Sequence, residues 1–316
     1  MSGNAGERIV QEPGEIGLPL RVIAMVPWPP VTGVGTMQKT WFITGASRGL
    51  GADIAKAALR AGDRVVATGR QREAVVAKLG ADNEQLLTVA LDVTDEAQVK
   101  AAVEAAVSRF GGIDVLVNNA GYGHLGLFEE LTMADARAQF DTNLFGVFSV
   151  TWAALPVMRA ARKGRIFNIS SLGGLTGVPL VSLYCATKFA LEGFSEALAK
   201  EVAPFGIHVT IVEPGPFRTE FLTRESLRFG DNLIADYDDR RAALRASFED
   251  RNGTQPGDPE KLAEAMVLLA NEAAPPMRYV AGSIAFNAAN EKLAGMLAEF
   301  EQWRELSVSA DGNYGG

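Results

Sequence analysis

The chain is poor in cysteine and histidine. Its 316 residues include one cysteine, Cys185, and two histidines. A single cysteine excludes an intrachain disulfide framework and is compatible with a reducing compartment, so we expect a cytoplasmic protein. With only two histidines, no metal site is expected.

Positive charge is also scarce. The chain has 30 lysine and arginine residues against 38 aspartate and glutamate residues, a net charge of −8, and no dense basic cluster. Nucleic-acid phosphates require a positive surface, so a nucleic-acid partner is not expected.

Long hydrophobic runs are missing as well. No apolar run approaches the roughly 18–20 residues that span a bilayer, so no membrane partner is expected. The early stretch Leu18–Val31 is broken by Arg21, Pro27, Pro29 and Pro30 and follows acidic residues, which makes it a poor signal peptide. We interpret residues 1–36 as an N-terminal extension, either disordered or produced by a misplaced start, because Met37 lies directly before the first strand pattern.

Strand-like apolar runs alternate with helical patterns from residue 39 onward. This alternation predicts an α/β fold with a three-layer, doubly wound, Rossmann-like parallel sheet in a single domain. We expect the catalytic domain over residues 37–290 and a C-terminal helix and tail over residues 291–316. The seven expected strands are Thr40–Thr44, Arg64–Thr68, Leu86–Leu91, Asp114–Asn118, Arg165–Ile169, His208–Val212 and Val280–Phe286.

Helical patterns fill the intervals. Asp95 with Gln98 resembles a capping box at the start of a helix that ends at Phe110. Glu260–Ala270 is a second predicted helix. Asn287–Leu306 is a third, with an apolar stripe that packs in the core or against another subunit. The stripe consists of Leu293, Met296, Leu297, Phe300 and Trp303.

One segment breaks the alternation. Residues 217–260 are charged, contain five aromatic residues and end in a turn-rich sequence. A long insertion of this kind either covers a substrate site or decorates the surface.

A glycine-rich turn, Thr44–Gly51, follows the first expected strand and opens a helix. Glycines at this place let the backbone approach a pyrophosphate, and the helix N-terminus favours negative charge. The strand–turn–helix context therefore indicates a dinucleotide site.

The second motif is a tyrosine–lysine pair. Tyr184 and Lys188 are four residues apart, so in a helix they share one face. A nearby cation lowers the pKa of a phenol, which suits tyrosine for proton transfer near neutral pH. Ser171, thirteen positions before Tyr184, can donate a hydroxyl hydrogen bond to an oxygen that gains negative charge.

These motifs together resemble the short-chain dehydrogenase/reductase family, in its compact one-domain branch, over residues 39 to about 290. The glycine turn has the spacing T-G-x-x-x-G-x-G. The family's other marks follow in order: Asn118-Asn119-Ala120-Gly121, Asn143, Ser171, Tyr184 with Lys188, Pro214-Gly215, and Thr219.

The resemblance implies a catalytic set. Tyr184 acts as general acid for carbonyl reduction and as base for the reverse, Lys188 lowers its pKa and binds the nicotinamide ribose, and Ser171 holds the substrate oxygen. Asn143, through its backbone and a water, connects Lys188 to solvent. Ser170 is the competing serine, but strand alternation and the spacing to Tyr184 favour Ser171.

The resemblance also implies a cofactor site that holds NADP(H). Family members that use NAD carry an acidic residue at the position of Gly69, whereas here Arg70 follows and Arg48 is a second cation; guanidinium groups suit a 2′-phosphate. The alternative for both is a solvated charge. The implied contacts are Gly45, Ser47, Arg48, Gly49, Leu50, Gly51, Arg70, Asp92, Val93, Asn119, Ala120, Gly121, Tyr184, Lys188, Pro214, Gly215 and Thr219.

Two of these contacts have an alternative interpretation. Asp92 and Val93 resemble the family's adenine contact, but Asp92 could equally cap the next helix. Thr219 resembles the residue that binds the nicotinamide carboxamide, with a helix cap as its alternative. His124 lies on the loop after the fourth strand and is either a pocket residue or a surface residue; we assign it no catalytic role.

The resulting interpretation is an NADP(H)-dependent oxidoreductase that interconverts a ketone or aldehyde and an alcohol. Three alternatives stay open: an NAD-linked alcohol or hydroxysteroid-type dehydrogenase, a non-catalytic NADPH-binding regulator, and a nucleotide-sugar epimerase or dehydratase. A nucleotide-sugar epimerase or dehydratase is disfavoured, because those relatives carry a T-G-x-x-G-x-x-G turn and a larger C-terminal domain. By analogy with the family, we expect a homo-oligomer, a dimer or tetramer, paired through the helices that bear Asn143 and Tyr184.

Overall fold

A seven-stranded parallel sheet forms the centre of the protein, with strand order β3-β2-β1-β4-β6-β7-β9. The computed structural model describes residues 38–219, 227–230, 232–250 and 253–312, which all belong to one compact unit. The predicted extension, residues 1–36, lies outside the described residues. The strands are β1 (Thr40–Ile43), β2 (Arg64–Gly69), β3 (Leu86–Ala90), β4 (Val115–Asn118), β6 (Gly164–Ile169), β7 (Ile207–Pro214) and β9 (Arg278–Ala281). The predicted doubly wound α/β fold is confirmed.

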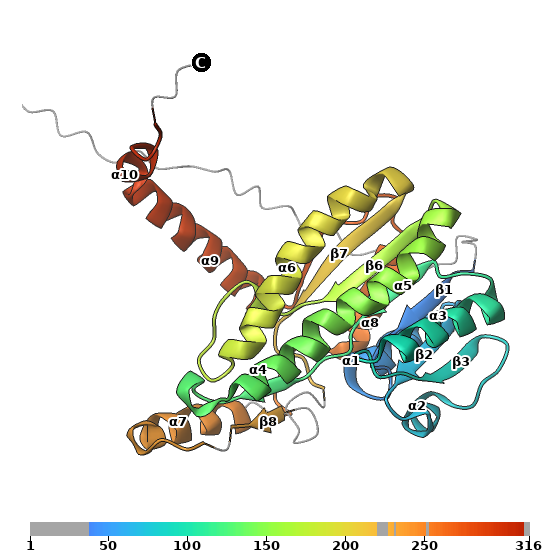
Figure 1. Ribbon diagram of the computed structural model, residues 1–316, viewed down its shortest axis with the longest axis horizontal. Coiled ribbons are helices and arrows are strands. Elements are labelled where there is room, and N and C mark those ends of the chain that lie inside the picture. The colour runs from blue at the N-terminus through green and yellow to red at the C-terminus, as the bar shows by residue number, and fades with distance from the viewer. Residues whose placement is uncertain (1–37, 220–226, 231, 251–252, 313–316) are drawn as a thin grey trace, which may run out of the picture. The chain divides into compact units, whose positions relative to one another are not determined.

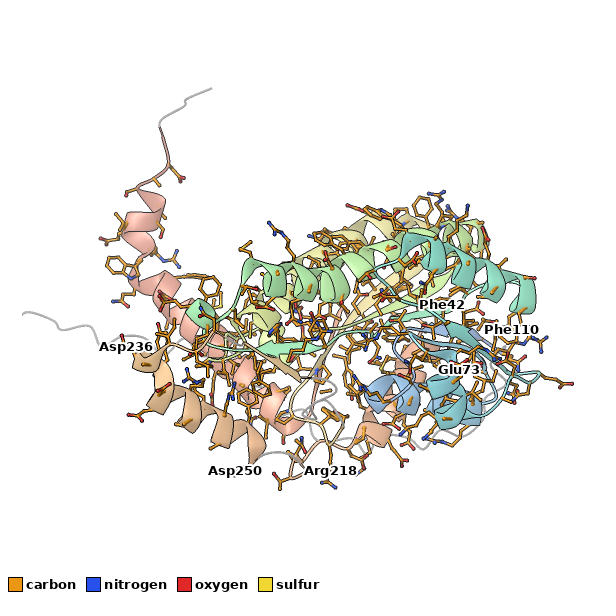
Figure 2. All side chains as sticks on the ribbon, turned by 60° about the horizontal axis from the view of Figure 1, so that its bottom comes forward. Phe42, Glu73, Phe110, Arg218, Asp236 and Asp250 are labelled. Carbon is orange, nitrogen blue, oxygen red and sulfur yellow. The ribbon has the colours of Figure 1, made fainter. Side chains whose placement is uncertain are left out.

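Helices cover both faces of the sheet (Figure 1). Successive side chains of a strand point to opposite faces, so Trp41 and Ile43 join one buried cluster and Phe42, labelled in Figure 2, joins the other. Helices α1 and α8 pack on the first face, and α3, α5 and α6 on the second. The helices are α1 (Gly49–Arg60), α2 (Arg72–Leu79), α3 (Glu96–Phe110), α4 (Met133–Phe140), α5 (Gly146–Ala161), α6 (Ser182–Val202), α7 (Asp238–Glu249), α8 (Pro259–Asn271), α9 (Ser283–Gln302) and α10 (Arg304–Val308).

Helix α3 has the ends that its sequence predicts, with one difference. The Asp95 carboxylate accepts the backbone N–H groups of Ala97 and Gln98 at 2.9 and 3.0 Å, as an N-cap does. The Gln98 side chain, however, accepts the N–H of Asp92 rather than that of Asp95, so the reciprocal half of the capping box is not formed. Because Asp95 is the cap, the cap alternative for Asp92 is wrong.

The C-terminal part differs from the expected boundaries. The last strand was expected at Val280–Phe286, but β9 ends at Ala281, Gly282 adopts a φ of +89°, and α9 begins at Ser283. A short apolar run cannot be assigned to strand or helix by periodicity alone, and here the positive φ of a glycine separates the two. The helix expected at Asn287–Leu306 therefore starts earlier and is interrupted at Trp303.

The apolar stripe of this last helix is not in the core. Leu293, Leu297, Phe300 and Trp303 are all more than half exposed. The expectation of core packing is wrong for these four side chains, and subunit packing stays a prediction.

One continuous helical stretch of the described residues, Met133–Ala161, is long and apolar enough by length and composition to cross a membrane. It comprises α4, the π-helical turn Asp141–Phe145, and α5. Val150, Ala154 and Met158 of α5 are completely buried in the cluster beneath the sheet. The apolar character of this stretch is therefore explained in part by its packing within the α/β unit.

Candidate active site

The candidate site lies where the order of the strands reverses. The chain moves outward from β1 to β2 and β3, then returns to place β4 on the other side of β1. Ligands of such sheets bind at this switch point, at the carboxyl ends of the strands. A cavity of about 1130 Å³ is lined there by residues that follow β1, β2, β3, β4, β6 and β7.

Almost all of the predicted site residues line this one cavity. Among the residues of the expected catalytic and cofactor-binding sets, Gly51 and Asn143 do not line it, and all the others do. Residues from seven separate places in the sequence are thus brought together. The volume exceeds the roughly 300–1,000 Å³ of common small-molecule sites, as a dinucleotide beside a substrate requires.

The glycine turn is shaped by close contact with the end of β4. Gly45 and Gly49 adopt positive φ values of +68° and +52°. The side chain of Asn119 donates to Thr44 O at 2.9 Å and Gly45 O at 3.1 Å. A Cβ on Gly51 would lie 2.4 Å from Asn119 Nδ2, so only glycine fits there. Gly51 therefore permits the packing of the turn rather than a contact with the ligand.

Two arginines line the cavity at the end of β2. Arg48 lies in the glycine turn and Arg70 directly follows β2. A Cβ on Gly69 would lie 2.9 Å from the Val75 side chain and 3.4 Å from Ser47 Cβ, so an acidic side chain at this position would be crowded. The surroundings thus offer positive charge and no carboxylate at the place where the family's NAD users carry one. Asp92 and Val93 line the same cavity, and the Asp92 carboxylate accepts the N–H and hydroxyl of Thr94.

The two adjacent serines point to different surroundings. Ser170 also lines the cavity, but it is buried and its hydroxyl is bonded to the carboxylate of Glu192. Ser171 accepts the N–H of Gly173 at 3.0 Å and forms a hydrogen bond with Tyr184. This arrangement supports Ser171 as the serine that meets a substrate.

The pKa of Tyr184 shifts opposite to the expected direction. Burial raises the pKa of Tyr184 to about 12, and the hydrogen bond with Ser171 only partly opposes that rise. Lys188 Nζ lies 5.6 Å from the centre of the Tyr184 ring and donates to Ile169 O at 2.7 Å. Burial also lowers the pKa of Lys188 to about 8. In the protein alone, loss of hydration therefore dominates the pKa of both groups, and the pKa of Tyr184 shifts in the direction opposite to the one expected.

Asn143 lies in the π-helical turn between α4 and α5. The wider turn is marked by the N–H of Gly146, which donates to Asp141 O, five residues back. The side chain of Asn143 is fully occupied: it bonds the N–H and C=O of Tyr122 at 3.1 and 3.0 Å and Thr187 Oγ1 at 3.3 Å. Its side chain thus braces the loop after β4, and any direct role falls to its backbone. Single π-turns of this kind occur frequently at functional sites.

A charged cluster behind Lys188 was not predicted. Arg278 of β9 bonds the carboxylates of Glu192, Glu196 and Glu213. Burial, together with the charge of Glu192, raises the pKa of Glu213 to about 7. The only sequence signal was the spacing of four residues between Lys188 and Glu192 on one helix face.

Two further predicted residues have different outcomes. Thr219 lines the cavity, and a Cβ on Gly49 would lie 3.9 Å from its side chain, so it borders the glycine turn. Residues 220–226, directly after Thr219, lie outside the described residues, so the alternative interpretation of Thr219 as a helix cap is not tested. His124 is buried rather than superficial: its backbone N–H donates to Gln139 Oε1 at 2.7 Å, and its ring Nε2 lies 3.6 Å from Asp135 Oδ1.

The insertion at residues 217–260 contributes to the site. Its strand β8 (Leu227–Phe229) pairs with β5 (Gly123–Leu125) on the loop after β4. Phe221 lies outside the described residues, and Tyr237 bonds Glu129 on the surface. The residues of the insertion that line the cavity are Phe217, Thr219, Arg228, Phe248 and Gln255. The aromatic residues of the segment indicated a possible cover for a substrate site, but no sequence pattern predicted that Gln255 would line the cavity.

These features define a dinucleotide-dependent oxidoreductase. A family model described as short chain dehydrogenase matches residues 39–228, and the chain belongs to that family. It is an NAD(P)-dependent dehydrogenase or reductase. It is 42% identical over 277 residues to Oxidoreductase BOA17 of Botryotinia fuckeliana, covering 87% of this chain and 100% of the relative. It is 40% identical over 244 residues to 3-ketodihydrosphingosine reductase of Bacteroides thetaiotaomicron, covering 77% of this chain and 87% of the relative.

Solved structures agree with the fold. A short-chain dehydrogenase from Streptomyces avermitilis matches with a TM-score of 0.80 and 39% identity, covering 87% of this chain and all of the other. The 3-ketoacyl-(acyl-carrier-protein) reductase from Brucella melitensis, solved with NADH, matches with a TM-score of 0.65 and 30% identity, covering 76% of this chain and 94% of the other.

Proposed function

We propose that this protein is an NADP(H)-dependent reductase that converts a ketone or aldehyde to an alcohol, with residues 37–290 as its catalytic domain. The observation that carries the proposal is the convergence of Ser171, Tyr184 and Lys188 on the cavity that the glycine turn also lines. A dinucleotide held by that turn and a carbonyl compound held by Ser171 would share one enclosed space.

NADP(H) is proposed over NAD(H) because of the charge at the end of β2. Arg48 and Arg70 line the cavity, and position 69, where a carboxylate would bind a ribose 2′-hydroxyl, is a glycine at which an acidic side chain would be crowded. A guanidinium binds phosphate through charge-assisted hydrogen bonds. Cellular NADPH is kept reduced, so the proposed direction is carbonyl reduction. The single cysteine is compatible with a reducing compartment, and the proposed compartment is the cytoplasm.

The proposed mechanism assigns proton transfer to Tyr184. The reduced nicotinamide supplies the hydride. Ser171 holds the carbonyl oxygen, and Tyr184 donates its phenolic proton to that oxygen as negative charge develops. Burial raises the pKa of Tyr184 to about 12, which keeps the phenol protonated at neutral pH. Because an alkoxide is a stronger base than a phenolate, the transfer still runs downhill, and a protonated phenol suits reduction better than oxidation.

The proposed substrate is largely apolar around its carbonyl. The side of the cavity next to Tyr184 is formed by Leu125, Val178, Val181, Cys185 and Phe248. Apolar linings of this kind bind ligands mainly through buried hydrocarbon surface. The relative named as a 3-ketodihydrosphingosine reductase is consistent with a ketone on an alkyl chain.

We further propose a homodimer formed through α5 and α6. Phe145, Trp152 and Phe189 are 54%, 72% and 46% exposed. The Phe148 ring contacts the rings of Phe145, Trp152 and Phe194, and the Phe148 and Phe194 centroids are 4.5 Å apart in a tilted arrangement. We call these five residues the aromatic patch. Exposed aromatics gathered in one place are typical of protein interfaces.

The test is a cofactor and substrate screen with the purified chain. Oxidation of NADPH and of NADH would be followed with matched aliphatic, aromatic and long-chain ketones and aldehydes. The proposal expects kcat/KM with NADPH to exceed that with NADH by about tenfold or more, as one or two charge-assisted hydrogen bonds provide. An equal or greater value with NADH would support the NAD-linked alternative. Tight NADPH binding without turnover of any carbonyl compound would support the regulator.

A further inference from the structure

Gln255 has an unusual environment for a buried amide. The residue is 3% exposed and lines the candidate cavity. In the part of the chain that the structure describes, neither Nε2 nor Oε1 of its side chain has a hydrogen-bond partner. A primary amide has two donors and an acceptor, and the large majority of buried polar side-chain atoms are paired. An unpaired amide at a cavity wall indicates a ligand that completes it.

The backbone around Gln255 is held firmly. The Gln255 carbonyl accepts both Nε and Nη2 of Arg218, at 3.3 and 3.2 Å; Arg218 is labelled in Figure 2. Gly257 donates to Pro216 O at 3.1 Å and accepts from Arg218 N at 2.9 Å. A Cβ on Gly257 would lie 2.7 Å from the Phe217 ring, so the two segments are in close contact. The amide is therefore presented from a fixed position.

That position adjoins the proposed nicotinamide half of the site. Pro216 follows the carboxyl end of β7, and Thr219, three residues on, borders the glycine turn through Gly49. The family resemblance assigns Thr219 to the nicotinamide carboxamide. Gln255 is attached to this same segment and lines the same cavity as Ser171 and Tyr184.

Resting on the proposed function, we propose that the Gln255 amide binds the carboxamide of the nicotinamide ring, donating one hydrogen bond and accepting another. Both a donor and an acceptor of Gln255 are unpaired, and a carboxamide presents the matching acceptor and donor side by side. A ketone oxygen only accepts and would complete half of this pair. A second contact beside Thr219 would fix the face that the ring presents to the substrate.

The experiment compares NADP⁺ with its 3-acetylpyridine analogue, in which a methyl group replaces the carboxamide nitrogen. Dissociation constants would be measured by isothermal titration calorimetry for the unaltered protein and for Gln255→Leu. We expect the unaltered protein to bind NADP⁺ about three- to tenfold more tightly than the analogue, the value of one neutral hydrogen bond. In Gln255→Leu this preference should fall close to unity. Gln71→Leu, at the Arg70 end of the cavity, is the matched control and should retain the preference.

A second variant guards against poor folding of the first. Gln255→Glu loses the N–H donors but keeps the size and the acceptor, and it is the acceptor that meets the N–H₂ group missing from the analogue, so we expect this variant to retain the preference that Gln255→Leu loses. Undiminished preference in Gln255→Leu with a raised KM for the carbonyl substrate would overturn the proposal and assign Gln255 to the substrate. Undiminished preference with only a lowered Tm would assign it a structural role. In both cases the unaltered protein would still reduce ketones with NADPH, so the proposed function would stand.

Discussion

At the residue scale, the chemistry depends on side chains at the cavity wall that are shielded from water to different degrees: Lys188 is buried and Tyr184 is half-buried. Burial raises the pKa of Tyr184 to about 12 and lowers that of Lys188 to about 8. The sequence predicted that these residues would meet, and it singled out Ser171 over Ser170. It could not predict the direction of the pKa shift, because that depends on how closely the folded chain surrounds Tyr184.

Cofactor selection is the first property to test at this scale. Arg70→Asp replaces a cation that lines the cavity with an anion that repels a 2′-phosphate. We expect the ratio of kcat/KM for NADPH over NADH to fall by about ten- to a hundredfold. Arg60→Asp, at the exposed end of α1, is the control and should leave the ratio unchanged. An unaltered ratio in Arg70→Asp would assign phosphate recognition to another residue.

The second property to test at this scale is the pH dependence of stability. Because burial raises the pKa of Glu213 from 4.5 to about 7, the folded state retains a proton that the unfolded chain loses over this range. Its contribution to the unfolding free energy therefore declines as the pH rises through about 4.5 to 7, by about 1.4 kcal/mol for each unit of pKa shift. Glu213→Gln should flatten this decline, as measured by urea denaturation at several pH values. The same slope in both proteins would contradict the assignment.

At the scale of elements, the segments between strands β7 and β9 are the least predictable from sequence. Six of the seven strands lie within one or two residues of their expected ends, because short apolar runs between glycine and polar turns indicate buried parallel strands. The cluster of Glu192, Glu213 and Arg278 could not be predicted without knowing which strands are neighbours in the sheet. β7 and β9 are adjacent in the sheet although the insertion and α8 separate them in the chain.

The attachment of α7 to the rest of the site can be tested through one buried ion pair. Arg241 of α7 bonds Glu130, which is 1% exposed and also accepts the N–H of Ile234 at 3.1 Å. Glu130→Gln leaves Arg241 with Asp238 as its charged partner among the described residues. Losing one partner of a buried pair costs up to about 3–5 kcal/mol.

We expect Glu130→Gln to lower the Tm and to raise the KM for the carbonyl substrate, while the dissociation constant for NADPH stays the same. The local reason is that α7 carries Phe248, which lines the substrate side of the cavity. Glu301→Gln is the matched control, because its pair with Arg304 is exposed and such surface pairs contribute little to stability. A change confined to NADPH binding would contradict this role of the segment.

At the scale of the whole molecule, two apolar surfaces of the described chain are unburied. One is the aromatic patch on α5 and α6, and the other is the stripe on α9. The sequence predicted that the stripe is apolar, but exposure depends on what the helix packs against, which periodicity does not reveal. The two surfaces lead to different expectations for assembly.

The proposed dimer is tested by placing a charge in the aromatic patch. We expect Trp152→Glu to halve the mass measured by light scattering after size exclusion, because a carboxylate at a 72%-exposed aromatic would be desolvated in the interface. Phe128→Glu is the control. Phe128 is 70% exposed, but it belongs to the short helical turn Phe128–Glu130 rather than to α5 or α6. If Leu297→Glu on α9 halved the mass and Trp152→Glu did not, the dimer would form through the stripe instead.

The most direct test of the whole account is the rate of carbonyl reduction by Tyr184→Phe at saturating NADPH. Removing one hydroxyl group should lower kcat by about 10²- to 10⁴-fold, the usual contribution of a positioned general acid, with the Tm and NADPH affinity preserved. Tyr279→Phe, which removes a phenol of β9 outside the cavity, should retain the original rate. A fully folded, NADPH-bound Tyr184→Phe that reduces the ketone as fast as the unaltered protein would contradict the account.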